Sequence, residues 1–95
     1  MNKAPTTFKP GATQTVAVAD SSAASSAVNA QTRDIRVVST VDAYVEISSA
    51  PTASSSSFIL PAFTVEYLRV AGADKVAFLR IGSTTGTARV TELSQ

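Results

Sequence analysis

Cysteine, histidine and tryptophan are all absent from the 95 residues of the chain. Without cysteine, the chain forms neither a disulfide nor a thiolate metal site. Without histidine, it can build neither an imidazole zinc site nor a nucleophilic triad that depends on a histidine base. The composition therefore excludes the commonest metal centres and histidine-based nucleophilic enzymes, and we expect no enzyme activity, catalytic residue, metal or cofactor.

Charged residues are also scarce. They make up 16% of the chain, whereas about 25% is typical of a soluble domain. Eight basic and seven acidic residues give a net charge of +1, without the basic stripe that nucleic-acid-binding proteins usually carry, so no nucleic-acid partner is expected. A small domain with so few charges is marginal as a monomer, and we expect other subunits, including copies of itself, to cover part of its surface.

Long apolar runs are missing as well. The first twelve residues contain no apolar segment of the kind found in a secretory signal. No stretch approaches the roughly 20 apolar residues that cross a bilayer. We therefore expect a protein that is made in the cytoplasm and has no membrane partner.

What the chain does contain is a series of short segments in which apolar and polar residues alternate. This period is typical of β-strands with one buried face. Strands are expected at residues 13–19, 33–40, 43–48, 58–60, 63–71, 75–81 and 87–93. About seven short strands separated by turn residues predict an all-β domain, a small antiparallel sandwich or barrel.

The segments between these strands carry more specific expectations. Residues 33–40 and 43–48 are expected to form a hairpin, and residues 82–86 a second hairpin loop. Residues 20–30 read as a loop or a ragged strand, with a short helical turn capped by Asp20 or Ser21 as the alternative. The serine-rich segment 49–57 reads as a loop. Pro61 marks a sheet edge or a corner. Residues 71–74 are expected to form a turn, in which Gly72 is free to take a positive φ.

Residues 58–82 form the most hydrophobic stretch and contain most of the aromatic residues. Phe58, Phe63, Tyr67 and Phe78 could form a stacking platform for a sugar or a single-stranded nucleic acid. Their mixed positions along hydrophobic strands favour core packing instead. Because both faces of these strands carry apolar groups, we expect one face to contact another subunit.

Residues 1–12 are expected to form an extended arm, and residues 13–95 a single β domain. Proline at positions 5 and 10 disfavours a helix in the arm. The arm carries three candidate partner-binding residues, in which Phe8 is an apolar anchor and Lys3 and Lys9 supply positive charge. If the arm lies along a neighbouring subunit, these residues would make the contact.

Two further sets of candidate residues lie in the strands. Tyr44 and Tyr67 are candidate partner-binding residues, which beside Asp42 or Glu66 would be typical of a glycan-binding surface. Glu46 and Glu66, both expected in the middle of strands, are the candidate carboxylate pair for glycoside hydrolysis. Outward-facing, solvated charges are the favoured interpretation of that pair.

From Asp34 onward, the sequence resembles a type of small virion protein of bacteriophages. The residues that carry the resemblance are Ile35 to Thr40 (IRVVST), Asp42 to Ile47 (DAYVEI), Pro51 to Ala53 (PTA), Phe58 to Ala62 (FILPA), Val65 to Val70 (VEYLRV), Val76 to Ile81 (VAFLRI) and Gly86 to Glu92 (GTARVTE). Residues 1–33 fall outside the match.

The resemblance implies an all-β, non-enzymatic component of the phage virion. We expect a capsid decoration (cement) protein of the phage head, made in the host cytoplasm. Its expected partners are the major capsid protein and other copies of itself, with a trimer as the expected homo-oligomer. The alternatives are a head–tail connector, a tail or fibre component, or a module that binds glycans on the host surface.

Overall fold

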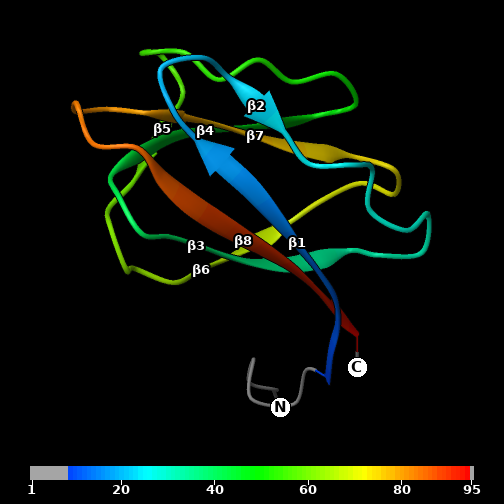
Figure 1. The fold of residues 1–95 in the computed structure, drawn as a ribbon. Coiled ribbons are helices and arrows are strands. Elements are labelled where there is room, and N and C mark those ends of the chain that lie inside the picture. The colour runs from blue at the N-terminus through cyan, green and yellow to red at the C-terminus, as the bar shows by residue number, and fades with distance from the viewer. Residues whose placement is uncertain (1–8, 95) are drawn as a thin grey trace.

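The computed structural model describes residues 9–94, which form two four-stranded antiparallel sheets packed face to face (Figure 1). The predicted all-β sandwich is confirmed, with eight strands. The strands are β1 (Lys9–Val18), β2 (Ala23–Ala24), β3 (Asp34–Ser39), β4 (Ala43–Ser48), β5 (Phe58–Leu60), β6 (Glu66–Arg69), β7 (Lys75–Arg80) and β8 (Gly86–Ser94). Residues 9–94 include no helix that could span a membrane.

Sheet A has the strand order β1-β8-β3-β6, and sheet B has the order β2-β7-β4-β5. Between them lies a core built from alternate residues of nearly every strand, as the period of two predicts. Its largest fully buried side chains are Phe78, Ile35, Leu60, Val18, Val37, Val45, Val76 and Val90. Burying each of these side chains contributes roughly 1.5–3 kcal/mol relative to leaving it exposed, so the inner faces hold the two sheets together.

The expected hairpin between residues 33–40 and 43–48 is wrong. Both strands exist, but β3 pairs with β6 and β8 in sheet A, whereas β4 pairs with β5 and β7 in sheet B. The corner between them is closed by Ser39, whose Oγ donates to the Val41 carbonyl at 2.6 Å. Alternation specifies which residues of a strand face the core, but it does not specify the neighbouring strand, so a corner between sheets resembles a hairpin in the sequence.

The loop at residues 82–86 also joins the two sheets rather than closing a hairpin, since β7 belongs to sheet B and β8 to sheet A. Gly86 begins β8 at a point where the backbone lies against Thr40 and Val41. A Cβ at position 86 would overlap both side chains. At the same point, the Thr40 amide donates to the Thr87 carbonyl and the Thr87 amide donates to Thr40 Oγ1, both at 2.9 Å.

The strand expected at residues 63–71 is shorter, because β6 spans only Glu66–Arg69. Phe63 has a φ of 57°, in the left-handed region, and so does not continue an extended strand. The Phe63 amide donates to the Ser39 carbonyl at 2.7 Å, and the Thr64 amide donates to Pro61. Pro61 therefore stands at the corner that the sequence predicts, between edge strands β5 and β6.

The expected turn at residues 71–74 is confirmed, with the Asp74 amide donating to the Ala71 carbonyl at 3.1 Å, but Gly72 does not use its freedom to take a positive φ. No described glycine has a positive φ, and Ala73 adopts one of 68° instead. Gly72 is needed for another reason: a Cβ at this position would overlap the backbone carbonyl of Ala30. The close approach of two backbones, rather than turn geometry, requires glycine here.

The first strand begins at Lys9 rather than at Thr13. It pairs with β8 along its length, with an irregularity between Pro10 and Thr13. Residues 9–12 of the expected arm therefore belong to a strand. Lys3 and Phe8 lie outside the described residues, so their expected role as partner contacts remains a prediction.

The segment at residues 20–30 is a ragged connection that contains the two-residue strand β2, as the sequence allows. The serine-rich loop that follows β4 lies over the outer face of sheet B. The Ala53 amide donates to Ser22 Oγ beside β2 at 2.9 Å, and Ser57 Oγ donates to Glu46 of β4 at 2.7 Å. Because β7 lies between β2 and β4, the loop crosses it, and Ala77 on that face of β7 is fully buried.

Candidate functional site

Four large apolar or aromatic side chains are exposed along one edge of the sandwich. Phe58 is 42% exposed, Ile59 59%, Phe63 74% and Tyr67 51%. All four lie within ten consecutive residues of the chain, and we call them the apolar edge. Single apolar side chains are normal on a surface, but four so close in the chain, on two edge strands and the turn between them, form a candidate interaction site.

The apolar edge follows from the sheet topology. Strand β5 is the edge of sheet B and β6 is the edge of sheet A, and the short turn between them joins the two sheets on one side of the molecule. The Asp42 carboxylate fixes this turn by accepting a hydrogen bond of 2.8 Å from the Ala62 amide. The exposed side chains therefore stand on a backbone that is held at both ends.

Phe63 is exposed because of its backbone conformation. At a φ of 57°, its side chain leaves the strand alternation, and the bond between its amide and Ser39 keeps it there. A bulky residue in the left-handed region is unusual and is worth about 1–3 kcal/mol of strain. Such strain persists where the surrounding structure imposes it, and it is often found at binding sites.

The expected partner-binding residues do not come together. Tyr44 is half-buried on the outer face of sheet B, where it lies opposite Ile59 of β5 and Leu79 of β7. Tyr67 lies on the outer face of sheet A, opposite Arg36 of β3. Lys9 is exposed at the start of β1, opposite Ser94. Only Tyr67 belongs to the apolar edge, with Tyr44 bordering it.

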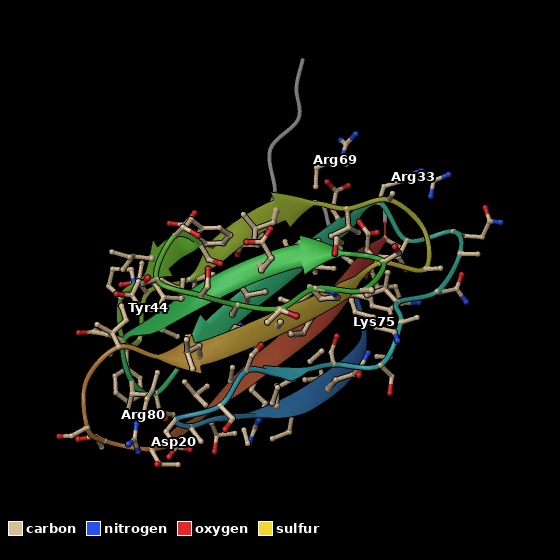
Figure 2. The ribbon with its side chains drawn as sticks, turned by 90° about the horizontal axis from the view of Figure 1, so that it is seen from above. Asp20, Arg33, Tyr44, Arg69, Lys75 and Arg80 are labelled. Carbon is tan, nitrogen blue, oxygen red and sulfur yellow. The ribbon has the colours of Figure 1, made fainter. Side chains whose placement is uncertain are left out.

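Figure 2 shows the spread of the polar groups over the molecule. Arg33 and Arg69 lie at one end of the sandwich, and Asp20 and Arg80 lie at the other. Tyr44 lies toward the second end, which is also where β5 pairs with the first residues of β4. The apolar edge is therefore nearer to the end that carries Asp20 and Arg80.

The sequence favours core packing for all four of these aromatic residues, and the structure confirms it for Phe78 alone. Phe78 is fully buried, whereas Phe58, Phe63 and Tyr67 are all at least two-fifths exposed. The physical reason is that the first two residues of β5, the turn after Pro61 and β6 lie at the sheet edges, where no further strand covers them. The three exposed rings are available to a partner.

The candidate carboxylate pair is divided between the sheets. Glu46 projects from β4 in sheet B and accepts the hydrogen bond from Ser57, whereas Glu66 begins β6 in sheet A. The one ion pair among residues 9–94 joins Arg69 Nε to Asp34 Oδ1 at 3.0 Å. No group of three or more possible metal ligands occurs within the same range.

Three residues of the surface were missed by sequence reasoning, namely Ile59, Arg36 and Arg89. Ile59 alternates with the buried Leu60, and this parity could have identified it as outward-facing. Arg36 and Arg89 alternate with the buried residues of β3 and β8 in the same way. That the two arginines lie on neighbouring strands could not be read from the sequence, because it depends on strand order.

Comparison of the chain with protein-family models, with curated proteins and with solved structures finds no match. The geometry of the apolar edge and the motifs of residues 34–92 are therefore the support for a function.

Proposed function

We propose that the protein is a non-enzymatic structural component of a phage virion, a capsid decoration (cement) protein. It binds the major capsid protein of the phage head as a small homo-oligomer, with a trimer as the expected state. The virion role rests on the motifs of residues 34–92. The observation that carries an assembly role is the apolar edge, which the chain's own residues 9–94 leave uncovered.

The mechanism is burial of the apolar edge against a neighbouring subunit. Aromatic side chains dominate the energetics of protein interfaces, and Phe58, Phe63 and Tyr67 would be its anchors. A standard interface buries about 1,600 Å² in total, so the apolar edge would be the centre of a larger contact. Many copies on one shell would add avidity.

The test is occupancy on purified phage capsids that lack the protein. The variant Phe58→Ser/Phe63→Ser should reduce occupancy at least about tenfold, because truncation of an interface hot spot typically costs more than 1–2 kcal/mol. Ala71→Ser is the matched control, since Ala71 is an exposed apolar residue in the turn at the opposite end of the sandwich. Unchanged occupancy of the double variant, with a wild-type circular dichroism spectrum, would contradict the role of the edge.

The number of copies in each virion separates the proposed role from the alternative virion roles. Hundreds of copies are expected of a decoration protein, whereas a connector or tail component would be present in far fewer. Quantitative mass spectrometry of purified virions measures this number. A low copy number would contradict decoration, and the apolar edge would then be a contact within a connector or tail.

The expected arm is tested separately. Deletion of residues 1–12 would remove the paired residues Lys9 and Pro10 of β1, so its effect on binding could not be separated from damage to sheet A. Deletion of residues 1–8 keeps every pair of β1. If the arm contacts the capsid through Lys3 and Phe8, this deletion should reduce occupancy while leaving the thermal unfolding temperature unchanged.

A further inference from the structure

The outer face of sheet A carries unbalanced positive charge. Four charged residues lie on it by strand register: Asp34, Arg36, Arg69 and Arg89. Three arginines and one aspartate give this face a net charge of +2, although residues 9–94 as a whole contain seven basic and seven acidic residues. The other described residues therefore have a net charge of −2, and within residues 9–94 the positive charge is concentrated on this face.

Two of these arginines have no carboxylate partner among the described residues. Asp34 is bonded to Arg69, and no hydrogen bond or ion pair of the Arg36 or Arg89 side chain occurs within residues 9–94. Arg36 is opposite Thr91 and Arg89 is opposite Val38 on the paired strands β3 and β8. They are therefore diagonal neighbours, roughly 7–8 Å apart at the backbone, a spacing at which a carboxylate between them would contact both guanidinium groups.

A hollow adjoins Arg89 on the same face. It has a volume of about 240 Å³ and is lined by Val38, Ser39, Thr40, Phe63, Thr87 and Arg89. This volume is smaller than the roughly 300–1,000 Å³ of a typical small-molecule site. With Val38, Phe63 and Arg89 in its lining, the hollow suits a single apolar side chain that is followed by an acidic one.

The two outer faces of the sandwich differ in how they are covered. The serine-rich loop lies across sheet B and buries Ala77. Over sheet A, no loop of the described chain takes this place. Thr15, Ala17, Tyr67 and Arg89 are exposed on this face, whereas Thr91 and Leu93 of β8 are buried on it. An extended segment could lie along the exposed part of this face, beside Tyr67 and Arg89, without displacing any described part of the chain.

We propose that the outer face of sheet A binds an extended acidic segment of a protein partner. Arg36 and Arg89 receive its carboxylates, Tyr67 packs beside Arg36, and the hollow at Phe63 receives an apolar side chain. This inference rests on the proposed function and deepens it, since it extends the contact of the capsid subunit from Phe63 and Tyr67 of the apolar edge across sheet A. A carboxylate-bearing protein is favoured over a nucleic acid because two unpaired arginines are far fewer than the phosphate contacts of a nucleic-acid-binding face.

The test needs no capsid, so its failure and failure of the proposed function are distinguishable. The probe is a short acetylated peptide in which glutamates alternate with leucines, titrated at low salt into the full isotope-labelled chain and followed by nuclear magnetic resonance. The expected result is a set of shifts confined to β3, β6, β8 and the Phe63 turn, together with the Arg36 and Arg89 Nε–H groups. The same peptide with glutamine in place of glutamate should bind much more weakly.

Charge-neutralising variants sharpen the test. Arg36→Gln and Arg89→Gln should each weaken peptide binding about two- to fivefold, as expected for partly exposed charge pairs. Arg33→Gln is the matched control, because Arg33 is an exposed arginine outside the face and its replacement removes the same charge. Equal weakening by all three variants, equal binding of the glutamine peptide, or tighter binding of an oligothymidylate would overturn the proposal.

Discussion

At the scale of single residues, two neighbouring positions in one turn have opposite requirements. Gly72 packs against the Ala30 carbonyl with no room for a Cβ, while Ala73 adopts a φ of 68° that suits glycine better than alanine. The usual rule that places glycine at the positive φ would exchange these two residues. Close approach of backbones outweighs the dihedral preference, since an atomic overlap costs more than an alanine in the left-handed region.

This pair gives the first prediction. Gly72→Ala should lower the free energy of unfolding by at least about 2 kcal/mol, because the new methyl group forces the two backbones apart. Ala73→Gly should leave stability unchanged or raise it by up to about 1 kcal/mol, because relief of the left-handed conformation is offset by the greater flexibility of unfolded glycine. Urea denaturation of both variants measures the difference. Equal effects of the two substitutions would contradict the structural explanation.

Phe63 supports a second prediction at this scale. Its ring is largely exposed, so removing it forfeits little burial, but any residue other than glycine at this position retains the strain of the positive φ. Phe63→Gly should therefore be more stable than Phe63→Ala by about 0.5–1 kcal/mol. Thermal unfolding of the two variants side by side measures this difference. A more stable alanine variant would show that the turn changes its conformation when the ring is removed.

At the scale of elements, the serine-rich loop behaves as a cover for sheet B. Its attachment is polar, through the bond from the Ala53 amide to Ser22 and the bond from Ser57 to Glu46. The apolar Ala53 is buried where the loop crosses the sheet. A segment without any apolar period thus acquires a defined path from a few hydrogen bonds and one small buried side chain.

The third prediction concerns this cover. Ser22→Ala removes the acceptor of the Ala53 amide and should cost about 1 kcal/mol, the usual net value of one hydrogen bond. Hydrogen exchange at the Ala53 amide should accelerate, whereas amides of β8 should keep their protection because the loop opens locally. Ser21→Ala is the control, since Ser21 is exposed and its side chain makes no hydrogen bond within residues 9–94. Unchanged exchange at Ala53 would show that the loop does not depend on Ser22.

The sequence predicts strands well and their partners poorly. Alternation located β3, β4, β7 and β8 to within about one or two residues, because burial of one face imposes the period directly. It gave no information on the sheet to which each strand belongs, so two connections between sheets were mistaken for hairpins. The exposure of Phe58 and Phe63 was missed for a related reason, since hydrophobicity alone does not distinguish a central strand from an edge.

At the scale of the whole molecule, stability depends on a small, tightly packed core. A domain of this size has a net stability of about 5–15 kcal/mol, and its centre is formed by the fully buried Phe78 with valines from both sheets. The two phenylalanines at positions 58 and 78 look alike in the sequence. Their positions in the fold assign one to interaction and the other to packing.

The fourth prediction compares these two residues. Phe78→Ala should lower the free energy of unfolding by about 3–5 kcal/mol because it leaves a cavity in the core. Phe58→Ala should cost less than half as much, because a large part of its ring is already in contact with solvent. Chemical denaturation of both variants in the same buffer provides the measurement. Similar losses for both would mean that Phe58 is buried in solution, for example by self-association of the chain.

The pairing of Lys9 with Ser94 has a practical consequence for attachment. Both strand ends leave the sandwich side by side, as the lower part of Figure 1 shows, while Pro61 and Phe63 turn beside Ser39 at the far end of β3. A tag, a fluorophore or a foreign domain joined near Ser94 would thus point away from the apolar edge. The protein can be anchored to a sensor surface by this end, with its exposed rings directed into solution. A displayed peptide joined at the same end would likewise point away from the exposed rings.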